Sequence, residues 1–314
     1  GGPLKLADFA SIGFEVFPLG MGTVQLGMPY GVGMVAPPSD SECVRLLRIA
    51  HDSGINYFDT APSYERSEFV VGKAFSALPE KPVIATKVML PSPADIHPSG
   101  LQQIVEDSCT TSMRALDLEQ IVIMQVHNLL SGHLVDELFT CMERLTRRGL
   151  VRFWGATVYD EVDATEIIAS GRFNTLQVPF STLDQRMSKT VFPAAIAAGM
   201  GLVFRSVFLK GILTHRYAEL PEELAALRNK VARLDALAGE AGLSLAELAF
   251  RFAAFAPFGQ VTLFGSSSAT ETAQNLELLQ RGPLADDLMA AIAALDFDEE
   301  LLTPVYSTMG WGPP

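Results

Sequence analysis

Four residues of this chain have side chains that could act together in proton transfer: Asp59, Tyr64, Lys87 and His127. A free phenol has a pKa near ~10 and is a poor acid at neutral pH, but a nearby cation favours the phenolate. An ammonium group withdrawn from water needs a carboxylate beside it, and Asp59 is placed to pair with Lys87. His127 can orient a carbonyl and share in proton transfer. The four residues together predict a site that protonates a carbonyl oxygen.

Any one of these residues alone is more often structural, as a cap, a solvated lysine or a core histidine. Their value lies in their positions, because each one sits at or just after the end of a short apolar run. Parallel α/β sheets place their chemistry at such strand ends. We therefore interpret the four side chains as one group on one rim of a sheet.

The elements that must position them alternate along the chain. Eight short apolar runs are predicted as buried strands, at 16–21, 55–58, 83–86, 121–126, 151–156, 175–178, 201–204 and 261–264. Amphipathic stretches between them are predicted as helices, among them 40–53, 67–78, 134–148, 220–241 and 269–279. This alternation predicts an α/β fold, a (β/α)8 TIM barrel, as a single domain over 1–314 with 297–314 as a C-terminal tail near the barrel mouth. An open doubly wound sheet is the alternative, but Gly20-Met21-Gly22 lacks the third glycine of a dinucleotide-binding turn.

Composition limits the classes of partner. The chain has 314 residues and a formal net charge of -13, so we expect neither nucleic acid nor an anionic membrane surface as a partner. Its three cysteines, Cys43, Cys109 and Cys141, lack a metal-binding spacing and predict reduced thiols in a cytoplasmic protein with no metal. The most apolar region, 245–264, contains charged residues and does not predict a membrane span. The sequence does not indicate an oligomeric state.

Three segments carry a family resemblance. They are Tyr57-Phe58-Asp59-Thr60-Ala61-Pro62-Ser63-Tyr64, Ala85-Thr86-Lys87-Val88 and Gln125-Val126-His127-Asn128. Together they resemble the signature of the aldo-keto reductases, in particular bacterial members acting on sugars and aldehydes. The resemblance extends from Gly20 to Asn275, and it implies a barrel that binds NAD(H) or NADP(H) without a Rossmann motif. It also implies hydride transfer between the nicotinamide and a carbonyl carbon, with Tyr64 protonating the oxygen. Glu65 departs from the pattern, which usually has glycine after the tyrosine.

The start of the last predicted helix is rich in hydroxyl groups. Free backbone N–H groups at a helix N-terminus suit a phosphate group. The resemblance identifies this as the adenosine-phosphate site, which implies cofactor contacts from Gly265, Ser266, Ser267, Ser268, Glu271, Gln274 and Asn275. The chain has no Lys or Arg between Gly265 and Leu279, and Glu271 would repel a 2′-phosphate. This favours NAD(H), while the serine hydroxyls leave NADP(H) open.

The nicotinamide end is predicted by the same resemblance. It implies cofactor contacts from Gly22, Thr23, Asp59, Thr157, Gln177, Arg205, Ser206, Phe208 and Lys210. Gln177 resembles the glutamine that holds the carboxamide, whereas Val158 stands where the family usually has an asparagine. Arg205 stands where an aromatic ring usually stacks on the nicotinamide. Two readings stay open: the guanidinium turns away, or it favours the reduced, uncharged ring.

The predicted function is reduction of the carbonyl of a small polar aldehyde, ketone or sugar. One alternative is an NAD-dependent aldose dehydrogenase that works in the oxidative direction. A second, from another class, is a dinucleotide-sensing binding subunit, and a third is an isomerase or lyase with Lys87 as a Schiff base. The loop at 28–38 is expected to overhang the barrel mouth, and Tyr306 and Trp311 are candidate lid residues.

Overall fold

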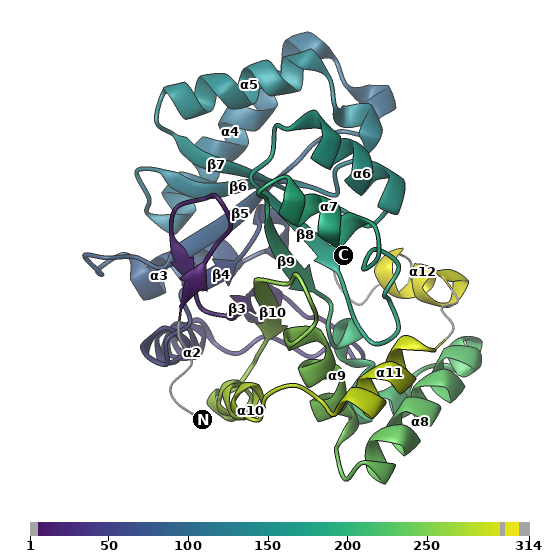
Figure 1. Ribbon diagram of the computed structural model, residues 1–314. Helices are drawn as coiled ribbons and strands as arrows, with labels where there is room; N and C mark the ends of the chain where they lie inside the picture. Colours follow the sequence, from purple (N-terminus) through teal and green to yellow (C-terminus); the bar gives the residue numbers. More distant parts are fainter. Residues whose placement is uncertain (1–5, 296–298, 308–314) are drawn as a thin grey trace.

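The computed structural model describes residues 6–295 and 299–307, and its centre is a closed barrel of eight parallel strands (Figure 1). The strands are β3 (Leu19–Gly22), β4 (Tyr57–Asp59), β5 (Val83–Met89), β6 (Ile121–His127), β7 (Val151–Thr157), β8 (Thr175–Pro179), β9 (Gly201–Arg205) and β10 (Val261–Gly265). Their order around the barrel follows the chain, and β10 closes it by pairing with β3. The predicted (β/α)8 barrel is confirmed.

Helices surround the strands on the outside (Figure 1). They are α1 (Val24–Gly27), α2 (Asp40–Asp52), α3 (Ser67–Phe75), α4 (Pro98–Leu116), α5 (Asp136–Arg147), α6 (Glu161–Ser170), α7 (Val191–Ala197), α8 (Ala225–Glu240), α9 (Leu245–Ala254), α10 (Ala269–Gln280), α11 (Asp286–Ala293) and α12 (Glu299–Ser307). Several begin at a residue whose side chain caps the free backbone N–H groups, such as Ser39 before α2 and Ser268 before α10. The helix predicted from residue 220 begins later, at Ala225, because Pro221 and two short 3-10 turns precede it.

The first predicted strand, 16–21, combines two elements. Val16 belongs to a hairpin of β1 (Ala7–Asp8) and β2 (Glu15–Val16), and the barrel strand begins only at Leu19. The hairpin is purple in Figure 1. Its tip residue Phe9 is fully buried and packs with Tyr57 and other barrel residues in one apolar cluster. The hairpin therefore fills the end of the barrel at which the strands begin.

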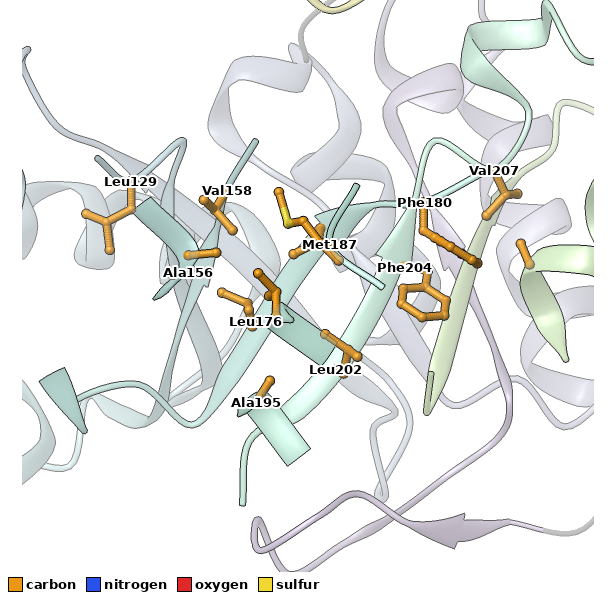
Figure 2. Packing of buried hydrophobic residues seen from close by; sticks show 14 of the residues in the cluster. Leu129, Ala156, Val158, Leu176, Phe180, Met187, Ala195, Leu202, Phe204 and Val207 are labelled. Carbon is orange, nitrogen blue, oxygen red and sulfur yellow. The ribbon is translucent and has the colours of Figure 1, made fainter. Parts of the chain in front are cut away.

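The main core lies between the strands and the helices. Figure 2 shows part of it, where Leu176 of β8 and Leu202 of β9 lie close to Ala195 of α7. All three side chains are fully buried. Strands covered on both faces in this way keep near-continuous apolar runs, which is why they were recognisable in the sequence.

The tail prediction, 297–314, falls partly outside the described residues, and Trp311 lies outside them. Within the described part, Tyr306 of α12 packs its ring on Tyr159 at 5.0 Å between centroids and donates a hydrogen bond to Asp184 at 2.8 Å. Arg186, two residues after Asp184, forms an ion pair with Glu299 of α12 at 2.7 Å. None of the helices in residues 6–295 and 299–307 has the length and apolar character needed to cross a membrane.

Candidate active site

The four predicted catalytic residues lie at one end of the barrel. Asp59 and His127 are the last residues of β4 and β6, and Tyr64 ends a 3-10 turn (Pro62–Tyr64) just after β4. Lys87 lies within β5, which continues two residues further than predicted, to Met89. Thr86 donates to Glu68 of α3, so it faces the helix layer. Since strand residues alternate between faces, Lys87 faces the barrel interior.

Lys87 connects the other groups. Its ammonium donates to Asp59 Oδ2 at 2.6 Å, to the Tyr64 hydroxyl oxygen at 3.1 Å and to the Thr60 carbonyl at 3.0 Å. Lys87 is fully buried and Tyr64 is 7% exposed. The ring of His127 is also buried and stands edge-on to Tyr64, with 6.4 Å between ring centroids. The structure thus brings the predicted tetrad together.

The electrostatics of Tyr64 differ from the sequence expectation. Burial, and next the charge of Asp59, raise the pKa of Tyr64, and the charge of Arg205 opposes this only in part. Burial also lowers the pKa of Lys87, although Asp59 opposes the change. The expected net lowering of the Tyr64 pKa is therefore wrong for this state, because burial and the charge of Asp59 raise that pKa. Tyr64 therefore keeps its proton at neutral pH.

Two glutamines complete the surroundings of Asp59. Gln125 and Gln177 each donate a side-chain hydrogen bond to Asp59 Oδ1 at 2.9 Å, and Gln177 also donates to Gln125 at 3.0 Å. Gln177 was predicted as a cofactor contact and Gln125 was missed. Its signal was in the sequence, because Gln125 lies two residues before His127 and therefore on the same face of the strand. Both carboxylate oxygens of Asp59 thus have partners.

The backbone around Tyr64 is tightly packed. A Cβ atom at Gly27 would lie 2.0 Å from the Tyr64 carbonyl oxygen, so only glycine fits there. Glu65, which replaces the usual glycine, has φ of 49° and ψ of −103°, a conformation that side-chain-bearing residues rarely adopt. The structure accommodates this departure by holding strained backbone next to the phenol.

A cavity of about 450 Å³ opens beside the tetrad. Asp59 and Tyr64 line it, whereas Lys87 and His127 do not. Most of the predicted cofactor residues also line it, namely Gly22, Thr23, Gln177, Arg205, Ser206, Phe208, Lys210, Gly265, Ser267, Glu271, Gln274 and Asn275. The predicted contacts Thr157, Ser266 and Ser268 are not in its wall. Thr157 accepts a hydrogen bond from the Asn128 backbone at 2.8 Å, and Ser266 donates to the Ser268 carbonyl at 2.7 Å.

The loop at 28–38 forms part of the cavity wall, as its expected position over the mouth requires. Tyr30, Gly31, Val32, Val35 and Ala36 line the cavity. The loop is held by Val32, whose backbone N–H donates to the Lys210 carbonyl at 2.9 Å and whose carbonyl accepts from Arg216. A Cβ at Gly31 would lie 2.7 Å from that same Lys210 carbonyl, which explains the glycine. The two loops therefore meet over the cavity.

The start of α10 presents both hydroxyls and a carboxylate. Ser268 caps the helix by accepting from the Glu271 backbone at 3.1 Å. The Glu271 carboxylate turns back and accepts from the Ser267 backbone N–H at 3.1 Å. Glu271 therefore places a carboxylate against the N–H just before the cap, next to the N–H groups that a phosphate would use at this helix N-terminus.

Arg205 lies at the end of β9 and turns toward β7. Its guanidinium stacks on the Tyr159 ring at 4.0 Å from the centroid and donates to the Val158 carbonyl at 3.2 Å. Within residues 6–295 and 299–307, no group of three or more His, Cys, Asp or Glu side chains is placed to hold a metal ion.

Comparisons with known proteins agree with this architecture. The sequence pattern of the Aldo/keto reductase family matches residues 18–296. The chain is 28% identical to pyridoxal 4-dehydrogenase from Microbacterium luteolum, over 84% of this chain and 90% of that protein. It is 26% identical to D-threo-aldose 1-dehydrogenase from a Pseudomonas species, over 85% and 91%. The structure of aldo-keto reductase AKR11C1 from Bacillus halodurans in its holo form has the same fold, with a TM-score of 0.78 at 22% identity, covering 96% of this chain and all of that chain. The chain therefore belongs to the Aldo/keto reductase family.

Proposed function

We propose that this protein is a nicotinamide-dependent oxidoreductase that reduces the carbonyl of a small polar aldehyde, ketone or sugar, with Tyr64 as the proton donor. The observation that carries the proposal is the position of the Lys87 ammonium, 2.6 Å from Asp59 and 3.1 Å from the Tyr64 hydroxyl oxygen. This group lies at the end of the barrel where strands of this fold end in catalytic residues. Asp59 and Tyr64 both face the cavity.

The raised pKa of Tyr64 suits a donor in this direction. The phenol is protonated at neutral pH, and it needs to give up its proton only when the carbonyl oxygen becomes an alkoxide, which is a stronger base than phenolate. The bound dinucleotide supplies the hydride that reaches the carbonyl carbon. Lys87 then stabilises the phenolate on Tyr64 through their contact, while Asp59 keeps the ammonium charged. His127, buried beside Tyr64, orients the carbonyl oxygen.

The residues that line the cavity suit the binding of a dinucleotide. Ser206, Lys210 and Gly211 all have positive φ angles, so the loop after β9 turns sharply, and all three residues lie in the cavity wall. Ser206–Lys210 would hold the central phosphates, Gln177 the nicotinamide, and Gly265–Asn275 the adenosine. Because Glu271 places a carboxylate at the start of α10, we propose NAD(H) over NADP(H).

A second direction of reaction is supported by the names of relatives. D-threo-aldose 1-dehydrogenase is named for oxidation of an aldose, and it matches 85% of this chain. In that direction Tyr64 would accept the proton from a sugar hydroxyl. The same residues serve both directions, since the proton donor of the reduction is the base of the oxidation.

A screen with both dinucleotides tests the proposal. The purified protein is assayed with NADH and NADPH on aldehydes and ketones, and with NAD⁺ and NADP⁺ on aldoses. Replacing Tyr64 with Phe removes only the hydroxyl, and we expect kcat to fall by roughly 10²–10⁴-fold while dinucleotide binding is retained. An unchanged rate in Y64F on an active substrate would exclude Tyr64 as the proton donor.

A further inference from the structure

Arg205 carries a buried positive charge at the active cavity. Its side chain is 7% exposed and lines the same cavity as Asp59 and Tyr64. The guanidinium is fixed from one side by the Tyr159 ring, and Tyr159 is in turn packed on Tyr306. An arginine held so firmly is pre-organised for a ligand, because little side-chain entropy remains to be lost.

The contacts of Arg205 leave its charge uncompensated. Nη2 donates to the Val158 carbonyl at 3.2 Å. Across residues 6–295 and 299–307, Nε has no hydrogen-bond partner, and no carboxylate lies within ion-pair distance of the guanidinium. A buried charge without a counter-charge is costly, so a site that keeps one has a use for it.

Lys87 provides the internal comparison. Its ammonium has a carboxylate partner of its own at 2.6 Å, and that carboxylate, Asp59, is fully engaged by Lys87, Gln125 and Gln177. Asp59 is therefore not available to Arg205. Lys210, another cation in the cavity wall, adds to the positive charge, and the charge of Arg205 lowers the pKa of Lys210. The cavity wall thus holds Arg205 and Lys210 close enough to affect each other, in a chain whose net charge is -13.

We propose that Arg205 binds a carboxylate of the substrate, so that the preferred substrates are carbonyl compounds or sugars that carry an acid group, such as oxo acids and uronates. This inference rests on the proposed function, since it names the substrate class of that site. Arg205 lines the cavity, so its guanidinium can form a charge-assisted hydrogen bond with a carboxylate bound there. Arg205 and Tyr64 line the same cavity, so one small substrate could meet both residues.

Pairs of substrates that differ in charge but not in shape test the proposal. D-glucuronate is compared with D-glucuronamide, and 4-oxobutanoate with its methyl ester, each as a ratio of kcat/KM values. We expect the wild type to prefer the charged member. In Arg205→Gln the ratio should fall by roughly 10- to 100-fold, the value of a hydrogen bond to a charged group. Arg205→Lys should lie between them, because an ammonium keeps the charge without the planar donor geometry.

Arg152→Gln is the matched control. Arg152 is exposed at the start of β7 and does not line the cavity, so its removal subtracts the same charge without changing the ratio. Circular dichroism of each variant shows whether it folds. If Arg205→Gln does not fold, Arg205→Lys decides the question.

The outcomes separate this inference from the proposed function. Equal ratios in wild type and Arg205→Gln overturn the carboxylate site, even if the enzyme is active. Equal losses for charged and neutral substrates, together with weaker dinucleotide binding, assign Arg205 to a dinucleotide phosphate and also overturn it. If no carbonyl compound is turned over, the proposed function fails. Calorimetric titration of the dinucleotide-loaded protein with glucuronate and glucuronamide then decides the inference alone, since only the acid should bind and only when Arg205 is present.

Discussion

Replacing Asp59 with Asn tests whether the buried ammonium of Lys87 depends on its carboxylate. Asp59 accepts hydrogen bonds from Lys87 on Oδ2 and from Gln125 and Gln177 on Oδ1. An asparagine amide has one acceptor and one donor end, so its NH2 group must face either the ammonium or the two glutamine donors. The fully buried Lys87 loses its counter-charge in either orientation.

The size of the effect follows from two limits. Removing one partner of a buried ion pair costs about 3–5 kcal/mol. The protein can escape part of this cost by deprotonating Lys87, which at pH 7 costs about 4.6 kcal/mol for a lysine with an unfolded-state pKa of about 10.4. We therefore expect Asp59→Asn to lower the free energy of unfolding by about 3–5 kcal/mol at pH 7.

The pH dependence distinguishes this cause from simple loss of packing. If Lys87 is neutral in folded Asp59→Asn, the unfolded chain binds one more proton. The free energy of unfolding then rises by about 1.4 kcal/mol per pH unit until the pH nears about 10.4. The wild type has a flatter profile, because Asp59 opposes the lowering of the Lys87 pKa. The difference between them should shrink by about 2–3 kcal/mol from pH 7 to pH 9.

Urea unfolding followed by circular dichroism at pH 7, 8 and 9 measures these values. Lys87→Met is the matched control, because it breaks the same ion pair without leaving an amine. Its destabilisation should not shrink between pH 7 and pH 9, whether the buried carboxylate stays ionised or takes up a proton. Parallel pH profiles for Asp59→Asn and the wild type would refute the reasoning.

Three further expectations follow from other parts of the structure. Gly27→Ala should destabilise the fold by at least about 2 kcal/mol in urea unfolding, because its Cβ would meet the Tyr64 carbonyl, whereas Gly239→Ala, with open space around it, should stabilise by roughly 0.4–1 kcal/mol. Glu271→Arg should shift the ratio of NADPH to NADH affinity upward by roughly tenfold in fluorescence titration, since it replaces the carboxylate at α10 with a phosphate-binding group; an unchanged ratio would mean that the ribose lies elsewhere. Burial, and next the charge of Arg205, lower the pKa of Lys210 to about 8, so Lys210 loses its charge as the pH rises from 7 to 9; dinucleotide affinity should weaken over that range in the wild type and stay level in Lys210→Met.

The sequence was sufficient for the barrel and for the tetrad because both depend on local patterns. Buried strands read as apolar runs, and the strands that carry Asp59 and His127 end at these residues. The N-terminal hairpin was missed because β1 and β2 have two residues each, too few for a period to be visible, and Val16 adjoins the barrel strand in the sequence.

Properties that depend on contacts between distant residues were beyond the sequence. The Gln125 contact with Asp59 joins residues 66 positions apart, and the pKa of Tyr64 depends on how deeply the surrounding loops bury it. Considering only the nearby Lys87 charge predicted a lowered pKa for Tyr64, which is the wrong direction, because burial of the phenol was left out. Arg205 illustrates the same limit, since its stacking on Tyr159 joins the end of β9 to the loop after β7, and the sequence does not show how these two segments lie.

The position of the N-terminal hairpin has a consequence for how Tyr64 regains its proton after each turnover. Phe9 and its apolar neighbours fill the end of the barrel at which the strands begin, whereas Tyr64 lines the cavity at the other end. On the proposed mechanism, each turnover consumes the hydrogen of the phenol, and its replacement must enter through the opening that product occupies. The product would then have to leave before Tyr64 is reprotonated. Solvent deuterium would therefore slow the steps after hydride transfer as well as the transfer itself.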